Sequence, residues 1–185
     1  MKIKENLASS ARELRDLRVP TTCAVMAALA VALDFVASIQ IGDYLKIGFS
    51  ALPNQLVDWL FGGVTGALFG GVMDIVKFII KPTGAFFPGY TLSAIAAGFI
   101  YGVSYYKKTP SLWRILATKA VVTLVVNAGM NTLWISMMTG KAFTVLLASR
   151  FVKEIVDLPV QAVLFFALVQ IVERSGVKKY THTQK

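Results

Sequence analysis

Long apolar runs separated by short polar segments dominate the pattern of this 185-residue chain. Several of these runs reach about 20 residues, the length that an α-helix needs to cross the hydrocarbon core of a bilayer. Breaks between the runs contain glycine, proline or charged residues, which are typical of turns. We expect six helices, over about residues 20–39, 51–61, 64–80, 90–106, 111–138 and 143–173. The pattern predicts an all-α integral membrane protein, folded as a single bundle of six transmembrane helices.

The connections differ in character. Residues 8–18 could form a short surface helix before the first apolar run, and residues 41–50 read as a polar loop. Gly62-Gly63 marks a tight break between two apolar helices. Residues 81–90 combine two prolines, two glycines and three aromatic residues. Breakers mixed with bulky apolar side chains predict an ordered loop that packs over part of the bundle.

Composition and charge fix the expected topology. The chain is 56% hydrophobic and carries a formal charge of +9. Twelve of its nineteen lysines and arginines fall in the N-terminal segment, in the turn near residues 107–114 and in the C-terminal tail. Cytoplasmic loops carry such an excess, so we expect one membrane domain over residues 1–185, with a cytoplasmic N-terminal segment (1–18) and a cytoplasmic tail (175–185). The same argument removes the need for a nucleic-acid partner.

The sequence argues against an enzyme. It has one cysteine, Cys23, in an apolar run, and one histidine, His182, in the polar tail, so we expect no metal site. No nucleophile and base are paired, and no cofactor fingerprint is visible. The glycine-rich stretches lack the Gly-Lys-Ser/Thr ending of a phosphate-binding loop, so ATP would have to be hydrolysed elsewhere.

Polar residues within the fifth helix are the first candidates for a binding site. Asn127, Asn131 and Trp134 lie three or four residues apart and would share one helical face. The asparagines can donate to and accept from a heterocycle, and Trp134 can stack on a flat ring. Hydrogen bonds between helices and an interfacial aromatic anchor are the alternative explanation.

A second candidate group lies in the sixth helix. Arg150, Lys153 and Glu154 follow a helical rhythm at membrane depth, where ionisable groups are costly and face a bundle interior or a cavity. The two cations could bind carboxylates of an anionic small molecule. The alternative is pairing within the helix, of Arg150 with Glu154 and of Lys153 with Asp157.

Small residues mark a possible contact face on the first helix. Ala24, Ala28 and Ala32 are spaced four apart, which lets another helix approach closely, either within the bundle or from a partner. Asp34 and Asp58 lie near the expected membrane interfaces. No role follows from the sequence for either of them or for Asp157.

At these motifs the chain resembles the substrate-binding S components of energy-coupling factor (ECF) vitamin transporters, most closely the folate family. The residues that carry the resemblance are 87–94 (FPGYTLSA), Gly98, Tyr101-Gly102, Asn127, 131–134 (NTLW), Arg150, Lys153 and 158–161 (LPVQ). The six-helix length and the alanine stripe on the first helix match as well. The resemblance covers nearly the whole chain.

The resemblance implies a multi-pass protein of the bacterial plasma membrane that captures folate from outside and has no cofactor of its own. Its implied partners are a transmembrane coupling subunit and two ABC ATPases, with the alanine stripe as the docking face. The substrate site would comprise Phe87, Tyr90, Asn127, Asn131, Trp134, Arg150, Lys153 and Glu154. Pantothenate or another vitamin, a small autonomous secondary transporter, and a structural membrane protein remain as alternatives.

Overall fold

A computed structural model describes the chain except residues 1, 15, 37, 42–44, 83–84 and 176–185, and it leaves undescribed the side chains of residues 2–3, 38–41, 45–48, 149–153 and 156. Helices dominate the described part. The elements are α1 (Lys2–Glu13), α2 (Arg18–Val36), β1 (Ser38–Ile41), β2 (Leu45–Gly48), α3 (Ala51–Ile80), α4 (Pro88–Tyr105), α5 (Leu112–Val122), the π-helix η1 (Thr123–Asn131), α6 (Thr132–Thr139) and α7 (Phe143–Arg174).

The element α3 is two helical segments folded back on each other at Gly62. That residue has φ 84° and ψ −172°, a backbone conformation that glycine alone adopts readily. Lys77 Nζ donates to Ser50 Oγ at 3.2 Å. A straight helix would hold two residues 27 positions apart at about 40 Å. The break predicted at Gly62-Gly63 is therefore confirmed, and it reverses the direction of the chain.

The N-terminal helix α1 holds this turn in place. Ser10 is fully buried, and its hydroxyl donates to the carbonyl of Phe61 at 2.5 Å. Tyr106, just past the end of α4, donates to the Glu13 carboxylate at 2.6 Å. Burial, together with that hydrogen bond, raises the pKa of Tyr106, so the phenol stays a donor at neutral pH. The helix predicted over 8–18 in fact spans Lys2–Glu13, and among its described side chains Ser10 is buried while the others are exposed or half-buried.

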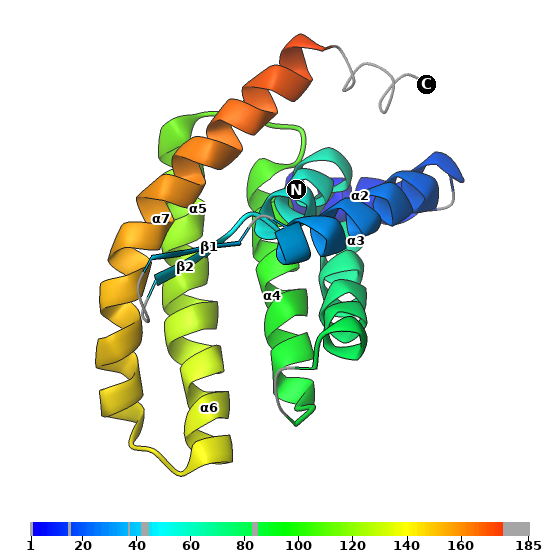
Figure 1. Cartoon of the computed structure of the whole chain (residues 1–185). Helices are drawn as coiled ribbons and strands as arrows, with labels where there is room; N and C mark the ends of the chain where they lie inside the picture. The colour runs from blue at the N-terminus through cyan, green and yellow to red at the C-terminus, as the bar shows by residue number, and fades with distance from the viewer. Residues whose placement is uncertain (1, 15, 37, 42–44, 83–84, 176–185) are drawn as a thin grey trace.

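Glycines bring α3 and α4 into close contact. A β-carbon at Gly98 would lie 2.3 Å from the carbonyl oxygen of Gly66, and one at Gly70 would lie 2.6 Å from that of Ala94. Small residues at such positions let two helix backbones approach without intervening side chains. This packing forms one half of the molecule, and α5 to α7 run beside it as the other half (Figure 1).

The arrangement of the connections follows from these pairings. In Figure 1 the α4–α5 connection and the C-terminal end of α7 lie at the top, whereas the α3–α4 and α6–α7 connections lie at the bottom. The residues predicted as one loop, 41–50, instead contain β2, which pairs antiparallel with β1 from Ser38↔Gly48 to Ile41↔Leu45. Isoleucines and leucine alternate with polar residues there, a pattern that suits a short hairpin.

Three helical stretches of the described chain are long and apolar enough to cross a membrane, namely Arg18–Val36, Ala51–Ile80 and Leu112–Thr139. The last of these is α5, η1 and α6 together, so the helix predicted over 111–138 is present but contains a π-helical centre. The sixth predicted helix, 143–173, corresponds closely to α7.

Candidate functional site

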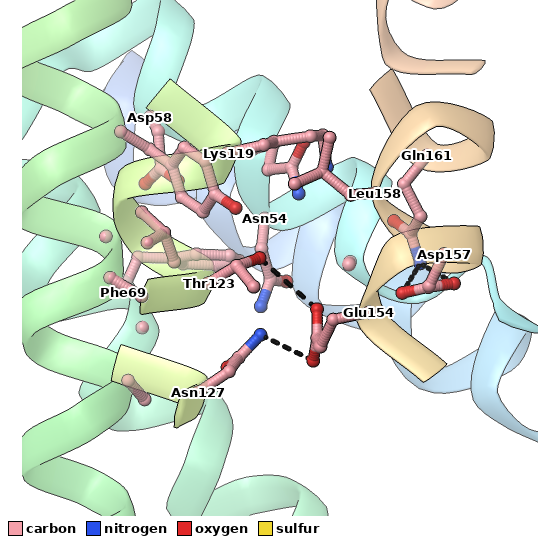
Figure 2. Close-up of a pocket in the computed structure, with 18 residues that line it drawn as sticks. Asn54, Asp58, Phe69, Lys119, Thr123, Asn127, Glu154, Asp157, Leu158 and Gln161 are labelled. Atoms are coloured by element: carbon pink, nitrogen blue, oxygen red, sulfur yellow. Dashed lines mark hydrogen bonds between the residues drawn. The ribbon is translucent and has the colours of Figure 1, made fainter. Parts of the chain in front are cut away.

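A polar cavity of about 250 Å³ lies where α3, α4, α5, η1 and α7 meet (Figure 2). Its walls combine apolar residues, such as Phe69 and Leu158, with amide, carboxylate and ammonium groups. Binding sites for small molecules typically have this mixture of apolar walls and a few convergent polar groups. Its volume lies below the range of about 300–1,000 Å³ that holds a whole drug-sized ligand, so it suits one end of such a molecule.

Glu154 is the polar centre on the α7 side of the cavity. Its carboxylate accepts hydrogen bonds from Asn127 Nδ2 at 3.0 Å and from Thr123 Oγ1 at 3.2 Å (Figure 2). Both donors come from η1, so these bonds join η1 to α7. This carboxylate faces the cavity from α7 and is acceptor-only while it is ionised. Asn131 Nδ2 extends this hydrogen-bond network by donating to Asn127 Oδ1 at 3.4 Å.

The α3 side of the cavity presents two amide oxygens without partners in the described structure. Gln55 is only 4% exposed, and its Oε1 atom makes no hydrogen bond with any described residue. The Oδ1 atom of Asn54 is also buried and makes no hydrogen bond with any described residue. A buried acceptor left unsatisfied costs about 1–3 kcal/mol. Both oxygens line the cavity, so a ligand that supplies N–H donors would remove this cost.

A buried cation completes the lining. Lys119 is 4% exposed and lies with its ammonium nitrogen 5.8 Å from the ring centroid of Tyr101. It interacts electrostatically with Asp157 and Glu154. Asp157 also accepts from Gln161 at 3.4 Å. Asp58, to which the sequence assigned no role, is 3% exposed and lines the same cavity.

A second cavity, of about 460 Å³, lies one helical turn further along both α3 and α4. It is lined by Asp74, Lys77 and Lys81 together with Phe87 and Tyr90. Lys77 Nζ donates to Ser50 Oγ at 3.2 Å, and Ser50 Oγ donates to Asp34 Oδ1 at 3.3 Å. These three side chains form a polar cluster next to Ala51, which lines the first cavity.

Trp134 lies between these regions and lines neither cavity. Its indole nitrogen donates to Ser93 Oγ at 3.0 Å, and its ring lies 5.6 Å from that of Phe87. A β-carbon at Gly89 would lie 2.7 Å from the indole, so the Pro88-Gly89 start of α4 leaves room for this ring. The structure thus places the aromatic residues Phe87, Tyr90 and Trp134 together at the α3–α4 end of the bundle.

The structure brings only part of the predicted site together. Asn127 and Glu154 line the first cavity, while Phe87 and Tyr90 line the second. The side chains of Arg150 and Lys153 lie outside the described residues. The first cavity also has a wall from α3, a helix that carries none of the site residues predicted from the sequence.

Comparison with known proteins identifies the class. Residues 19–169 match the family described as "ECF transporter, substrate-specific component", and the chain therefore belongs to that family. The family predicted from the motifs is confirmed. Membership makes this chain a transport component.

Two relatives and one solved structure are similar to most of this chain. The chain is 35% identical over 161 residues to "Folate transporter FolT" of Clostridium novyi (strain NT), covering 87% of this chain and 93% of the relative. It is 28% identical over 168 residues to "Folate transporter FolT" of Leuconostoc mesenteroides subsp. mesenteroides, covering 85% and 90%. A solved structure, "Crystal structure of FolT bound with folic acid", has a TM-score of 0.73 at 28% identity and covers 83% of this chain and 93% of its own.

Proposed function

We propose that this chain is the folate-binding subunit of an ECF-type importer. The observation that carries the proposal is the polar cavity in which Gln55 and Asn54 present unsatisfied amide oxygens opposite the Glu154 carboxylate. Folate ends in a pterin ring whose amino and ring N–H groups donate in parallel from one edge. Such an edge complements the amide oxygens of Gln55 and Asn54 on one wall or the Glu154 carboxylate on the other. Family membership and the folate-related relatives support the same substrate.

The test is binding by the purified protein. Titration with folate, pantothenate and other B vitamins, followed by calorimetry, should give saturable binding for folate and much weaker binding for the others. Tight binding of pantothenate with no response to folate would reassign the substrate. No binding of any vitamin would leave a structural role as the better explanation.

Two sets of cations could meet the glutamate carboxylates at the other end of folate. The first is Arg150 with Lys153 on α7, and the second is Lys77 with Lys81 at the second cavity. A pterin in the first cavity leaves the tail to extend toward one of them. We assign the tail to Arg150 and Lys153, because a guanidinium matches a carboxylate with two parallel hydrogen bonds.

Replacing Arg150 with alanine is expected to weaken folate binding by about 1.5–3 kcal/mol, the range for hydrogen bonds to charged groups. Lys81→Ala is the matched comparison, since Lys81 is the outermost cation of the second cavity and its ammonium packs over Phe35 at 5.4 Å. Calorimetry on both variants decides the matter. A loss confined to Lys81→Ala would move the tail into the second cavity.

Delivery of the bound vitamin requires partners, and we assign these as a transmembrane coupling subunit and two ABC ATPases. The helix α2 supports this role because only Val19 and Ala30 among its residues are buried. Ala24, Ala28 and Ala32 are all exposed, beside the exposed side chains of Val25 and Leu29. An apolar, groove-forming face of this kind suits a partner helix.

Ala28→Leu is expected to abolish energised uptake while folate binding stays within about twofold of the wild type, because leucine fills the groove on an exposed face. Uptake in cells that co-express the partner subunits, together with binding by the purified variant, separates the two effects. Loss of both would show that the stripe packs internally. Uptake by this chain without partners would favour an autonomous transporter.

The membrane arrangement belongs to the same proposal. Counting the two segments of α3 separately, we assign six spans, with both termini in the cytoplasm of a bacterial cell and the α3–α4 and α6–α7 connections outside. The enrichment of basic residues near residues 107–114 and at both ends of the chain supports this orientation. The first cavity would then open toward the outer face.

A further inference from the structure

A basic recess lies at the opposite end of the α3–α4 pair from the second cavity, and its lining on α4 begins at Gly102, directly after Tyr101 of the first cavity. It has a volume of about 610 Å³ and lies between α1, the turn at Gly62-Gly63 and the end of α4. Lys107, Lys108 and Arg114 supply three positive charges to its lining, and Glu5 supplies one negative charge. No role in vitamin binding involves this recess.

The three cations are held in place but not neutralised. Lys107 Nζ donates to Ser9 Oγ at 2.8 Å, Lys108 Nζ to the Val103 carbonyl at 3.3 Å, and Arg114 to the Thr109 carbonyl at 2.7 Å. All three acceptors are uncharged. Within the described part of the chain, no carboxylate forms an ion pair with any of these side chains. The recess therefore retains donors and positive charge for an anion.

An apolar path leads from the recess along the helices. Ile95, Phe99 and Val103 follow one another at four-residue spacing on α4 and therefore form one stripe that ends at the recess. Val103 and Ile95 pack over the positions of Gly63 and Gly71 on α3, so the stripe follows the seam between the two helices. Ile95 is 38% and Phe99 42% exposed, which leaves this seam open on the surface of the protein.

The chemistry of the two ends together matches one class of ligand. A phospholipid has a phosphate at the level of the membrane surface and acyl chains that run into the hydrocarbon. Trp113 is 81% exposed next to Arg114, and exposed tryptophans of membrane proteins gather at the level of the headgroups. Basic pockets between helices on the cytoplasmic side bind anionic headgroups. We propose that this recess is a binding site for one anionic phospholipid, with its phosphate among Lys107, Lys108 and Arg114 and an acyl chain along the Ile95–Phe99 seam.

The experiment is native mass spectrometry of the purified protein in detergent, with phosphatidylglycerol or phosphatidylcholine of equal chain length added. Phosphatidylglycerol should bind at least about tenfold more tightly, since each basic residue adds to the attraction of an anionic headgroup. The variant K107Q/K108Q/R114Q should reduce phosphatidylglycerol binding to the level of phosphatidylcholine. The matched control R18Q/K141Q/R174Q removes the same charge from exposed residues elsewhere and should keep the preference.

Several results would overturn the site. The site would be wrong if the wild type bound the two lipids equally. It would also be wrong if the matched control lost as much phosphatidylglycerol binding as the triple variant, because net charge alone would then explain the preference. Glycerol 3-phosphate should not compete, because it lacks acyl chains; full competition would indicate a soluble anion as the ligand. The single variant K108E covers the case in which the triple variant misfolds, since Lys108 is exposed and its ammonium donates to a backbone carbonyl. It should lower phosphatidylglycerol binding severalfold while folate binding stays unchanged.

Discussion

The variant Gln55→Leu is expected to bind folate about 10- to 100-fold more weakly while unfolding at an equal or higher temperature without ligand. Gln55 is 4% exposed, and its Oε1 atom has no hydrogen-bond partner among the described residues. Leucine has a similar size and removes an unsatisfied buried acceptor, which stabilises the empty protein by about 1 kcal/mol. The same change leaves a pterin N–H donor without its acceptor, which costs about 1–3 kcal/mol of binding.

The opposite signs of the two effects make this variant informative. Calorimetry would give the affinity, and thermal unfolding in detergent with and without folate would give the two stabilities. Gln170→Leu is the matched control, because Gln170 is exposed on α7 and the same substitution there should alter neither quantity much. If Gln55→Leu bound folate like the wild type, the pterin would have to lie outside the first cavity.

The helices were predictable because their signal is local. Runs of apolar residues set their lengths, and glycine and proline set their ends. What the pattern could not predict is how a break bends the chain. Gly62-Gly63 permits many geometries, and the reversal at Gly62 depends on Ser10 of α1, more than 50 residues earlier, bonding to the Phe61 carbonyl. Such a contact has no periodic signature.

The candidate site was also predictable only in part. Polar residues in the stretch 125–161 stood out because charges at membrane depth are unusual, and Asn127 and Glu154 do line the cavity. The wall from α3 was missed, although Asp58 lies four residues after Asn54 and three after Gln55 in the otherwise apolar segment of α3 before Gly62. That polar face was the available signal.

The position of Trp134 could not follow from spacing. Its expected face assumed α-helical geometry from Asn127 onward, but η1 covers Thr123–Asn131 with wider, i→i+5 turns. These wider turns rotate the residues after Asn131 around the helix axis, compared with their place in a continuous α-helix. Trp134 consequently contacts Ser93 and Phe87 of the α4 region rather than the first cavity.

Gly62→Ala is expected to lower the stability of the protein strongly, because both the backbone conformation and the space at this position disfavour a β-carbon. Gly62 has φ 84° and ψ −172°, a conformation that costs a residue with a β-carbon about 1–3 kcal/mol. The added carbon would also lie 2.9 Å from Cγ of Tyr106 and 3.1 Å from Ser10 Oγ. Overpacking of this kind typically costs a further 1–3 kcal/mol. We therefore expect a total loss of about 2–6 kcal/mol, seen as a large fall in the unfolding temperature.

Gly140→Ala separates the two causes. Gly140 also has a positive φ, 68°, but no atom outside its own neighbourhood lies within 4 Å of an added β-carbon. Only the backbone cost of about 1 kcal/mol applies there. A Gly62→Ala protein that unfolds at the same temperature as Gly140→Ala would show that neither Tyr106 nor Ser10 constrains the turn. A loss at Gly62 that exceeds its backbone cost of about 1–3 kcal/mol would show that α1 and the end of α4 close tightly around the reversal, which in turn holds Gln55 and Asn54 opposite Glu154.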